Sequence, residues 1–234
     1  MSSRRQKSKE IQKRLEDSQG VGICAVLGCN EPTRYAAGEG FDQKLCRKHW
    51  EYYQRHGSPY RGSYTASDLK EPRRWAEDWL KANQDDQRVQ ITLGKIQTLL
   101  RTAGPVVPAF RLKGSKPAKR AKVAWARLRE ASVSPEQILH AWISIERMIA
   151  TDPQAINTAE FKHVQVAKVL HRLASGTHKT WQRERFDGTI VEDKQSFYPR
   201  SRGRVLRVMG KQLEEVVHMV EGQLERDKYK QTTR

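Results

Sequence analysis

Apolar side chains recur at helical spacing through the middle of the chain. Between residues 71 and 103, two apolar runs have the three- and four-residue spacing of a helix face, and the first run carries Trp75 and Trp79. A Gly-Pro pair at residues 104–105 ends the pattern, because neither residue continues a helix readily. The sequence therefore predicts a helical segment over residues 65–104.

The C-terminal half shows the same spacing with clearer helix boundaries. One helix is expected over residues 118–131. The sequence Ser-Pro-Glu-Gln at residues 134–137 is typical of an N-terminal capping box, and Asn-Thr-Ala-Glu at residues 157–160 is a second one. Residues 182–199 are irregular, and the Asp-Gly pair within them indicates a short hairpin.

The last predicted helix begins near residue 201 and ends near residue 229. Five apolar residues follow one another in three- and four-residue steps along it: Leu206, Met209, Leu213, Val216 and Val220. Such a seam can pair two chains into a homodimer, or it can pack inside the chain's own bundle. We favour packing within the bundle, because three heptads are close to the shortest repeat that supports a coiled coil.

Composition places these helices in a strongly basic protein. The chain has 234 residues and a formal net charge of +17. We find no apolar run long enough to cross a bilayer and no signal-peptide core near Met1, so we expect an intracellular protein with no membrane partner. A positive charge of this size attracts polyanions, and nucleic acid is the commonest of them.

The three cysteines fall close together, and a histidine follows the last of them. Cys24, Cys29, Cys46 and His49 have the spacing Cys-x4-Cys-x16-Cys-x2-His. Zinc prefers thiolate and imidazole ligands in a tetrahedron, and four protein ligands leave no position open for a substrate. The pattern therefore predicts a structural Zn²⁺ site in a treble-clef-like finger, in which a turn supplies the first ligand pair and a helix supplies the second.

The sequence around the second ligand pair resembles a known zinc-binding segment. Residues 44–59 read Lys-Leu-Cys-Arg-Lys-His-Trp-Glu-Tyr-Tyr-Gln-Arg-His-Gly-Ser-Pro, which is similar to the segment found in bacteriophage HNH-type homing endonucleases and related phage proteins. The resemblance covers about residues 22–61. It implies that the three cysteines and His49 bind the metal and that the following helix lies against DNA. A phage-encoded protein would act in the cytoplasm of an infected bacterial host.

The catalytic part of those nucleases has no counterpart in this sequence. They carry a second motif with an Asp-His pair, a central Asn and a final His, and we find no such arrangement downstream of the finger. Lys44 and Ser58 also replace the Gly and the Asp that are usual in the resembled segment. We therefore expect a protein that is not an enzyme, and we keep a nuclease with an unrecognised active site as the alternative.

Positive charge is concentrated in intervals that contain no acidic residue. They occupy residues 87–129, 161–183 and 194–213, whereas ordinary surfaces mix both signs. Lys and Arg bind phosphate and release its counterions, so we expect nucleic-acid contacts from the finger helix and from the first and third intervals. The expected contact residues are Arg47, Lys48, Tyr52, Arg55, His56, Arg61, Arg111, Lys113, Lys116, Lys119, Arg120, Lys122, Arg200, Arg202, Arg204 and Arg207.

Aromatic residues interleave with the positive charge around the finger helix. Aromatic rings can stack on unpaired bases, or they can form the small core of the finger. We expect Trp50 and Tyr53 to belong to that core, because they lie one helical turn from Cys46 and His49.

These patterns together predict a mainly α-helical protein, with a small treble-clef-like zinc finger followed by a helical C-terminal domain. The expected parts are a basic flexible arm (residues 1–19), the zinc finger (20–64), a helical segment (65–104), a linker (105–117) and a helical domain (118–234).

The functional expectation is a phage-type accessory protein that contains zinc and binds nucleic acid, with DNA favoured over RNA. The alternatives are the nuclease described above and a regulator that binds RNA polymerase or another nucleic-acid enzyme.

Overall fold

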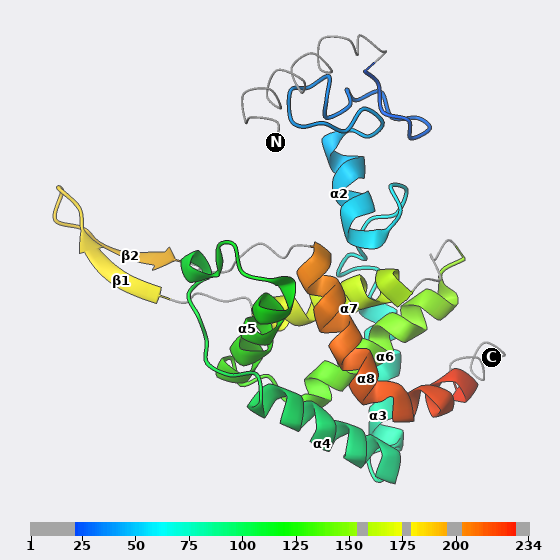
Figure 1. Cartoon of the computed structure of the whole chain (residues 1–234). Helices are drawn as coiled ribbons and strands as arrows, with labels where there is room; N and C mark the ends of the chain where they lie inside the picture. The colour runs from blue at the N-terminus through cyan, green and yellow to red at the C-terminus, as the bar shows by residue number, and fades with distance from the viewer. Residues whose placement is uncertain (1–21, 154–158, 175–178, 196–202, 228–234) are drawn as a thin grey trace, which may run out of the picture. The chain divides into compact units, whose positions relative to one another are not determined.

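The computed structural model describes residues 22–153, 159–174, 179–195 and 203–227 (Figure 1). These residues form seven α-helices, one short 3₁₀-helix and one two-stranded sheet, which confirms the predicted mainly α-helical fold. The chain divides into two compact units, the first ending at Gly62 and the second beginning at Ser63. The predicted arm at residues 1–19 and the first half of the predicted capping box at residues 157–160 lie outside the described residues.

The first unit consists of loops and one helix, α2 (Arg47–His56). Backbone hydrogen bonds join the loops, and one of them runs from the N–H of Ala25 to the carbonyl of Lys44 at 2.8 Å. The unit has very little apolar interior. Its buried cluster consists of Cys24, Val26 and Cys46, with Cys29 and Leu45 packed against it.

The second unit contains the remaining elements. Its helices are α3 (Lys70–Ala82), α4 (Gln87–Arg101), η1 (Ala109–Leu112), α5 (Pro117–Glu130), α6 (Pro135–Thr151), α7 (Ala159–Leu173) and α8 (Gly203–Asp227). Strands β1 (Lys179–Glu184) and β2 (Ile190–Gln195) pair in antiparallel register. The apolar faces of the helices meet in one core, whose largest buried side chains include Trp125, Trp142 and Phe161.

Several local predictions are confirmed. The hydroxyl of Ser134 accepts a hydrogen bond from the N–H of Gln137 at 3.3 Å, and the Gln137 side chain accepts one from the N–H of Ser134 at 2.9 Å, which completes the capping box. Trp75 and Trp79 are both buried on one side of α3. The predicted hairpin also forms, and Gly188 adopts a left-handed φ of 78° in its turn.

Residues 105–117 connect two parts of the second unit and do not separate two modules as the predicted linker would. Helix α4, before this segment, packs against α6 and α8, which follow it. Side chains of α5 hold the segment in place: Arg129 donates to the carbonyl of Gly104 at 2.6 Å, and Arg127 donates to the carbonyl of Val107 at 3.2 Å. The Gly and Pro residues of this segment therefore mark a connection between helices that share one core.

The apolar seam of α8 packs within the chain. The helix contacts α4, α5 and α7, and its buried apolar residues are Val205, Leu206, Met209, Leu213, Val217, Val220 and Leu224. Val216, which we assigned to the seam, is only half-buried, and Val217 takes the interior position. The seam that we considered for a homodimer is therefore occupied by the chain's own bundle.

A half-buried lysine of α7 pairs with carboxylates of α6 and α8. The ammonium group of Lys162 lies 2.8 Å from a carboxylate oxygen of Glu146, 3.2 Å from Glu214 and 3.3 Å from Glu221. Its Nζ also lies 4.7 Å from the centre of the Trp142 ring. Burial disfavours the charged lysine, but the three carboxylates outweigh burial and raise its pKa above the ordinary value.

Gly210 marks the closest approach of α7 and α8, and its substitution tests their packing. A Cβ at this position would lie 2.5 Å from the main-chain oxygen of His163, which cannot move without shifting α7. We expect Gly210→Ala to lower the free energy of unfolding by about 1–3 kcal/mol in urea denaturation. Gly222, on the same helix, has open space within 4 Å of the place that a methyl group would take, so Gly222→Ala should stabilise by up to about 1 kcal/mol. Equal effects of both changes would contradict the close approach at Gly210.

Replacing Lys162 tests the partly buried charge cluster. Lys162→Met leaves three carboxylates close together without their cation, and we expect it to lower the free energy of unfolding by about 1–3 kcal/mol at neutral pH. The control is Lys81→Met, which removes an exposed lysine from its pair with Glu77 and should leave stability nearly unchanged.

The pH dependence of the stability difference between the wild type and Lys162→Met gives a further check. Burial raises the pKa of Glu214, but the hydrogen bond to His163 and the charge of Lys162 outweigh burial and lower that pKa below its ordinary value. The stabilisation from Glu214 is therefore present above the ordinary glutamate pKa and is lost as the pH falls below it. The difference in free energy of unfolding between the wild type and Lys162→Met should therefore become smaller on acidification. A difference that becomes larger would contradict the pairing of Glu214 with Lys162.

Candidate metal centre

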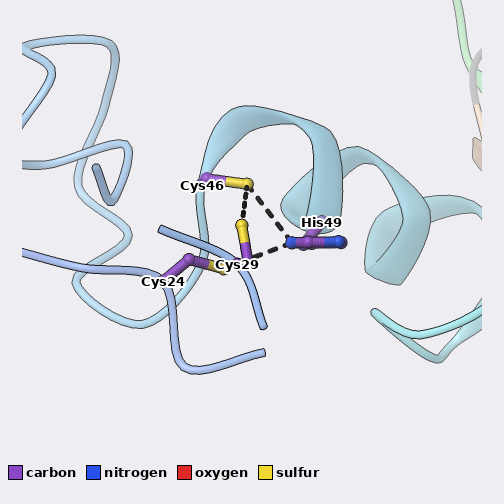
Figure 2. A group of neighbouring side chains, drawn as sticks. All are labelled: Cys24, Cys29, Cys46 and His49. Carbon is purple, nitrogen blue, oxygen red and sulfur yellow. Dashed lines mark hydrogen bonds between the residues drawn. The ribbon is translucent and has the colours of Figure 1, made fainter. Parts of the chain in front are cut away.

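The first pair of candidate ligands flanks a tight turn. The N–H of Cys29 donates to the carbonyl of Val26 at 3.0 Å. Gly28 adopts a φ of 77°, which is a left-handed conformation that glycine reaches without steric cost. The turn brings the side chain of Cys29 back toward that of Cys24 (Figure 2).

The second pair is set by the start of α2. Cys46 occupies the N-cap position, and its carbonyl accepts the N–H of Trp50 at 2.9 Å. His49 lies in the first helical turn, so its ring points to the same side as the Cys46 sulfur. The Sγ of Cys46 lies 3.3 Å from the Nδ1 of His49, which identifies Nδ1 as the nitrogen that faces the cysteines.

The four ligand atoms converge on one point. All lie within 4.8 Å of one another, with Cys24 Sγ 3.3 Å from His49 Nδ1 and Cys29 Sγ 3.9 Å from Cys46 Sγ (Figure 2). A tetrahedral ion bound at about 2.3 Å by sulfur and about 2.1 Å by nitrogen would separate its ligand atoms by roughly 3.6–3.8 Å. The observed separations lie close to these edges, so the four residues could bind a metal ion.

The site is enclosed by the protein. Cys24 and Cys46 are buried, and Cys29 and His49 are half-buried. Burial raises the pKa of the Cys24 thiol, but hydrogen bonds from the backbone of Cys46 and Val26 outweigh burial and lower that pKa. At Cys24 these backbone groups favour the thiolate, which is the form that binds metals. Burial and the neighbouring Cys24 and Cys29 side chains instead raise the pKa of the Cys46 thiol.

The Tyr52 ring lies near two histidine rings, those of His49 and His56. The Tyr52 ring lies 6.1 Å from the His49 ring and 6.3 Å from the ring of His56, which is buried. Tyr52 and His56, which we expected to contact nucleic acid, thus help to hold the interior of the finger. Tyr53, which we expected in that interior, is 48% exposed.

Two basic residues of α2, Arg47 and Arg55, pair with the same glutamate, Glu51. Arg47 is exposed, and its side chain lies 3.7 Å from Glu51 and 3.4 Å from Glu39. Arg55 lies 2.7 Å from the same Glu51. Lys48 is exposed, with its ammonium group 6.0 Å from the Tyr52 ring. Arg61 is half-buried. Among the residues of α2 that we expected to contact nucleic acid, Arg47 and Lys48 are therefore the exposed ones.

In the second unit, the predicted contact residues lie mostly on the surface. The exposed members of this set are Arg111, Lys113, Lys116, Lys119, Lys122 and Arg204, and the half-buried members are Arg120 and Arg207. Arg207 lies 3.9 Å from Glu160. Arg200 and Arg202 lie outside the described residues. Helices α5 and α8 pack against each other, with Trp125 donating to Gln212 at 3.0 Å. Lys119, Arg120 and Lys122 on α5 and Arg204 and Arg207 on α8 therefore belong to neighbouring helices.

One surface aromatic of this unit was missed by sequence reasoning. Phe110 is 72% exposed within the first acid-free interval. An isolated phenylalanine gives no periodic signal, and the two prolines around it were the only local hint that the segment does not form a regular helix.

No protein-family model, curated protein or solved structure matches this chain. Among the described residues, no helix combines the length and the apolar composition that crossing a membrane requires. The ligand geometry and the distribution of charge therefore carry the functional conclusion.

Removing one ligand tests the metal centre. We expect the purified protein to contain one metal ion per chain, and we expect both Cys46→Ser and His49→Ala to release it, because three remaining ligands no longer close the site. The control is His218→Ala, which removes an exposed histidine of α8. Elemental analysis measures the metal, and hydrogen exchange should show faster exchange in residues 22–62 only. Metal-free wild-type protein with a protected first unit would contradict this assignment.

Proposed function

We propose that this protein is a zinc-stabilised accessory protein that binds nucleic acid, with DNA preferred to RNA. The observation that carries the proposal is the convergence of Cys24, Cys29, Cys46 and His49 at the start of α2, on which Arg47 and Lys48 are exposed. A finger of this kind presents a basic helix at a fixed position. The net charge of +17 supports a polyanionic partner.

Zinc fits the ligand set better than other common ions. Magnesium and calcium prefer oxygen ligands, whereas three sulfurs and one imidazole nitrogen suit zinc. Four protein ligands leave no open position, so the ion would be structural and would supply folding free energy when bound. The small apolar cluster of the first unit supports this role, because the ligands Cys24 and Cys46 are two of its three buried members.

Both units have exposed basic side chains that can bind a phosphate backbone. The ion pairs of Arg47 are exposed, and exposed pairs are weak, so a phosphate can compete with Glu39 and Glu51. In the second unit, Arg111, Lys113, Lys116 and Lys119 are exposed in an interval without acidic residues. Several such contacts give an affinity that depends steeply on salt.

The preference for DNA and the phage setting rest on the resemblance of residues 44–59 to the zinc segment of phage HNH-type endonucleases. A phage accessory protein of this kind would act in the cytoplasm of the infected cell. It could work alone on DNA or assist a polymerase or another nucleic-acid enzyme.

Neutralising exposed charge tests the binding surface. We expect the quadruple change of Arg111, Lys113, Lys116 and Lys119 to Gln to weaken binding to all DNA sequences alike. The slope of log affinity against log salt should flatten by about 0.7–0.9 for each phosphate that the variant no longer binds. Fluorescence anisotropy at several salt concentrations measures both quantities.

The matched control removes the same charge elsewhere. The control residues Lys70, Arg74, Lys81 and Arg226 are exposed on α3 and α8 and lie outside the acid-free intervals. Changing these four residues to Gln should alter the salt slope much less. Equal effects of the two quadruple changes would show that net charge alone attracts DNA. Absence of binding at low salt would contradict the proposed function, and DNA cleavage that requires a divalent metal ion would favour the nuclease alternative.

A further inference from the structure

Two phenylalanines of the second unit project into solvent, and their surroundings differ. Phe186, in the turn of the hairpin, and Phe110, in η1, have the greatest exposure among the aromatic residues described in this unit. The hairpin from Lys179 to Gln195 contains four basic and four acidic residues, so its charge is balanced. Phe110 instead lies in the interval 87–129, which contains no acidic residue. Of these two rings, only Phe110 lies in a segment whose positive charge attracts an anion.

The backbone around Phe110 is fastened to the core on both sides. Before it, the carbonyls of Gly104 and Val107 accept hydrogen bonds from Arg129 and Arg127 of α5. After it, the Leu112 side chain is 2% exposed and anchors the end of η1 in the interior. The Phe110 ring is 72% exposed although its backbone is held in place on both sides. The ring therefore has a fixed position on the surface.

One positive group lies over this ring, and two more follow it in the sequence. The guanidinium carbon of Arg111 lies 5.7 Å from the centre of the Phe110 ring, and Lys113 and Lys116 follow within six residues. All three side chains are exposed. A flat apolar ring beside cations is the combination that binds a nucleotide, because the ring takes the base and the cations take the phosphates on either side.

We propose that Phe110 and the basic side chains beside it form a stacking site for an unpaired base of single-stranded nucleic acid. The ligand must be single-stranded at this point, because the bases of a duplex already stack on each other. Phenylalanine has no hydrogen-bonding group, so the site accepts any base. This inference rests on the proposed function and specifies the form of nucleic acid that the second unit binds.

The test compares two probes on the full-length protein: a fluorescein-labelled 20-nucleotide oligothymidine and a 20-base-pair duplex. Phe110→Ala should weaken oligothymidine binding by about 5- to 100-fold, as expected for the loss of one stacked base, and should leave the salt slope and the duplex affinity unchanged. Phe110→Trp should retain the affinity. Phe186→Ala is the control, because it removes a ring that is even more exposed than Phe110 from the charge-balanced hairpin, and it should change neither affinity.

The outcomes separate this inference from the proposed function. If the wild type binds both probes and Phe110→Ala binds oligothymidine normally, the stacking site is wrong and the proposed function stands. Equal loss for duplex and single strand would also overturn the stacking site. If the wild type binds neither probe at low salt, the proposed function itself is wrong. Tighter binding of polyglutamate than of oligothymidine would assign the surface to an acidic protein segment and overturn the inference.

Discussion

The first unit depends on the convergence of three cysteines and one histidine. Its buried apolar cluster is too small to hold about forty residues together, and two of the ligands are part of that cluster. The same four residues fix the start of α2, because Cys46 caps the helix and His49 lies in its first turn. Bringing the ligands together therefore both folds the finger and sets the direction in which Arg47 and Lys48 project.

The second unit is held together by its apolar core, and much of its positive charge remains exposed on the surface. Its core is large and apolar, and the half-buried Lys162 is paired with three carboxylates. Arg127 and Arg129 of the acid-free interval bind backbone carbonyls and serve the fold. The exposed members of that interval do not pack in the core, and their accumulation without acidic neighbours supports the proposed binding of nucleic acid.

The features that the sequence predicts well are local. Ligand spacing, the capping box at residues 134–137 and the hairpin turn each involve residues close in the chain, and all three are observed. Features set by long-range packing were missed. Nothing local distinguishes Val216 from Val217 on α8, and nothing in residues 105–117 reveals that α4 and α5 share one core.

Photochemical cross-linking tests the central claim, that exposed residues of α2 and of the basic surface of the second unit contact nucleic acid. The full-length protein is irradiated with a 20-nucleotide oligothymidine that contains 4-thiothymidine, and the cross-linked peptides are identified by mass spectrometry. The account predicts cross-links within residues 106–122 and within α2. Cross-links restricted to α3 or to the hairpin, or none above those of an unrelated basic protein, would contradict it.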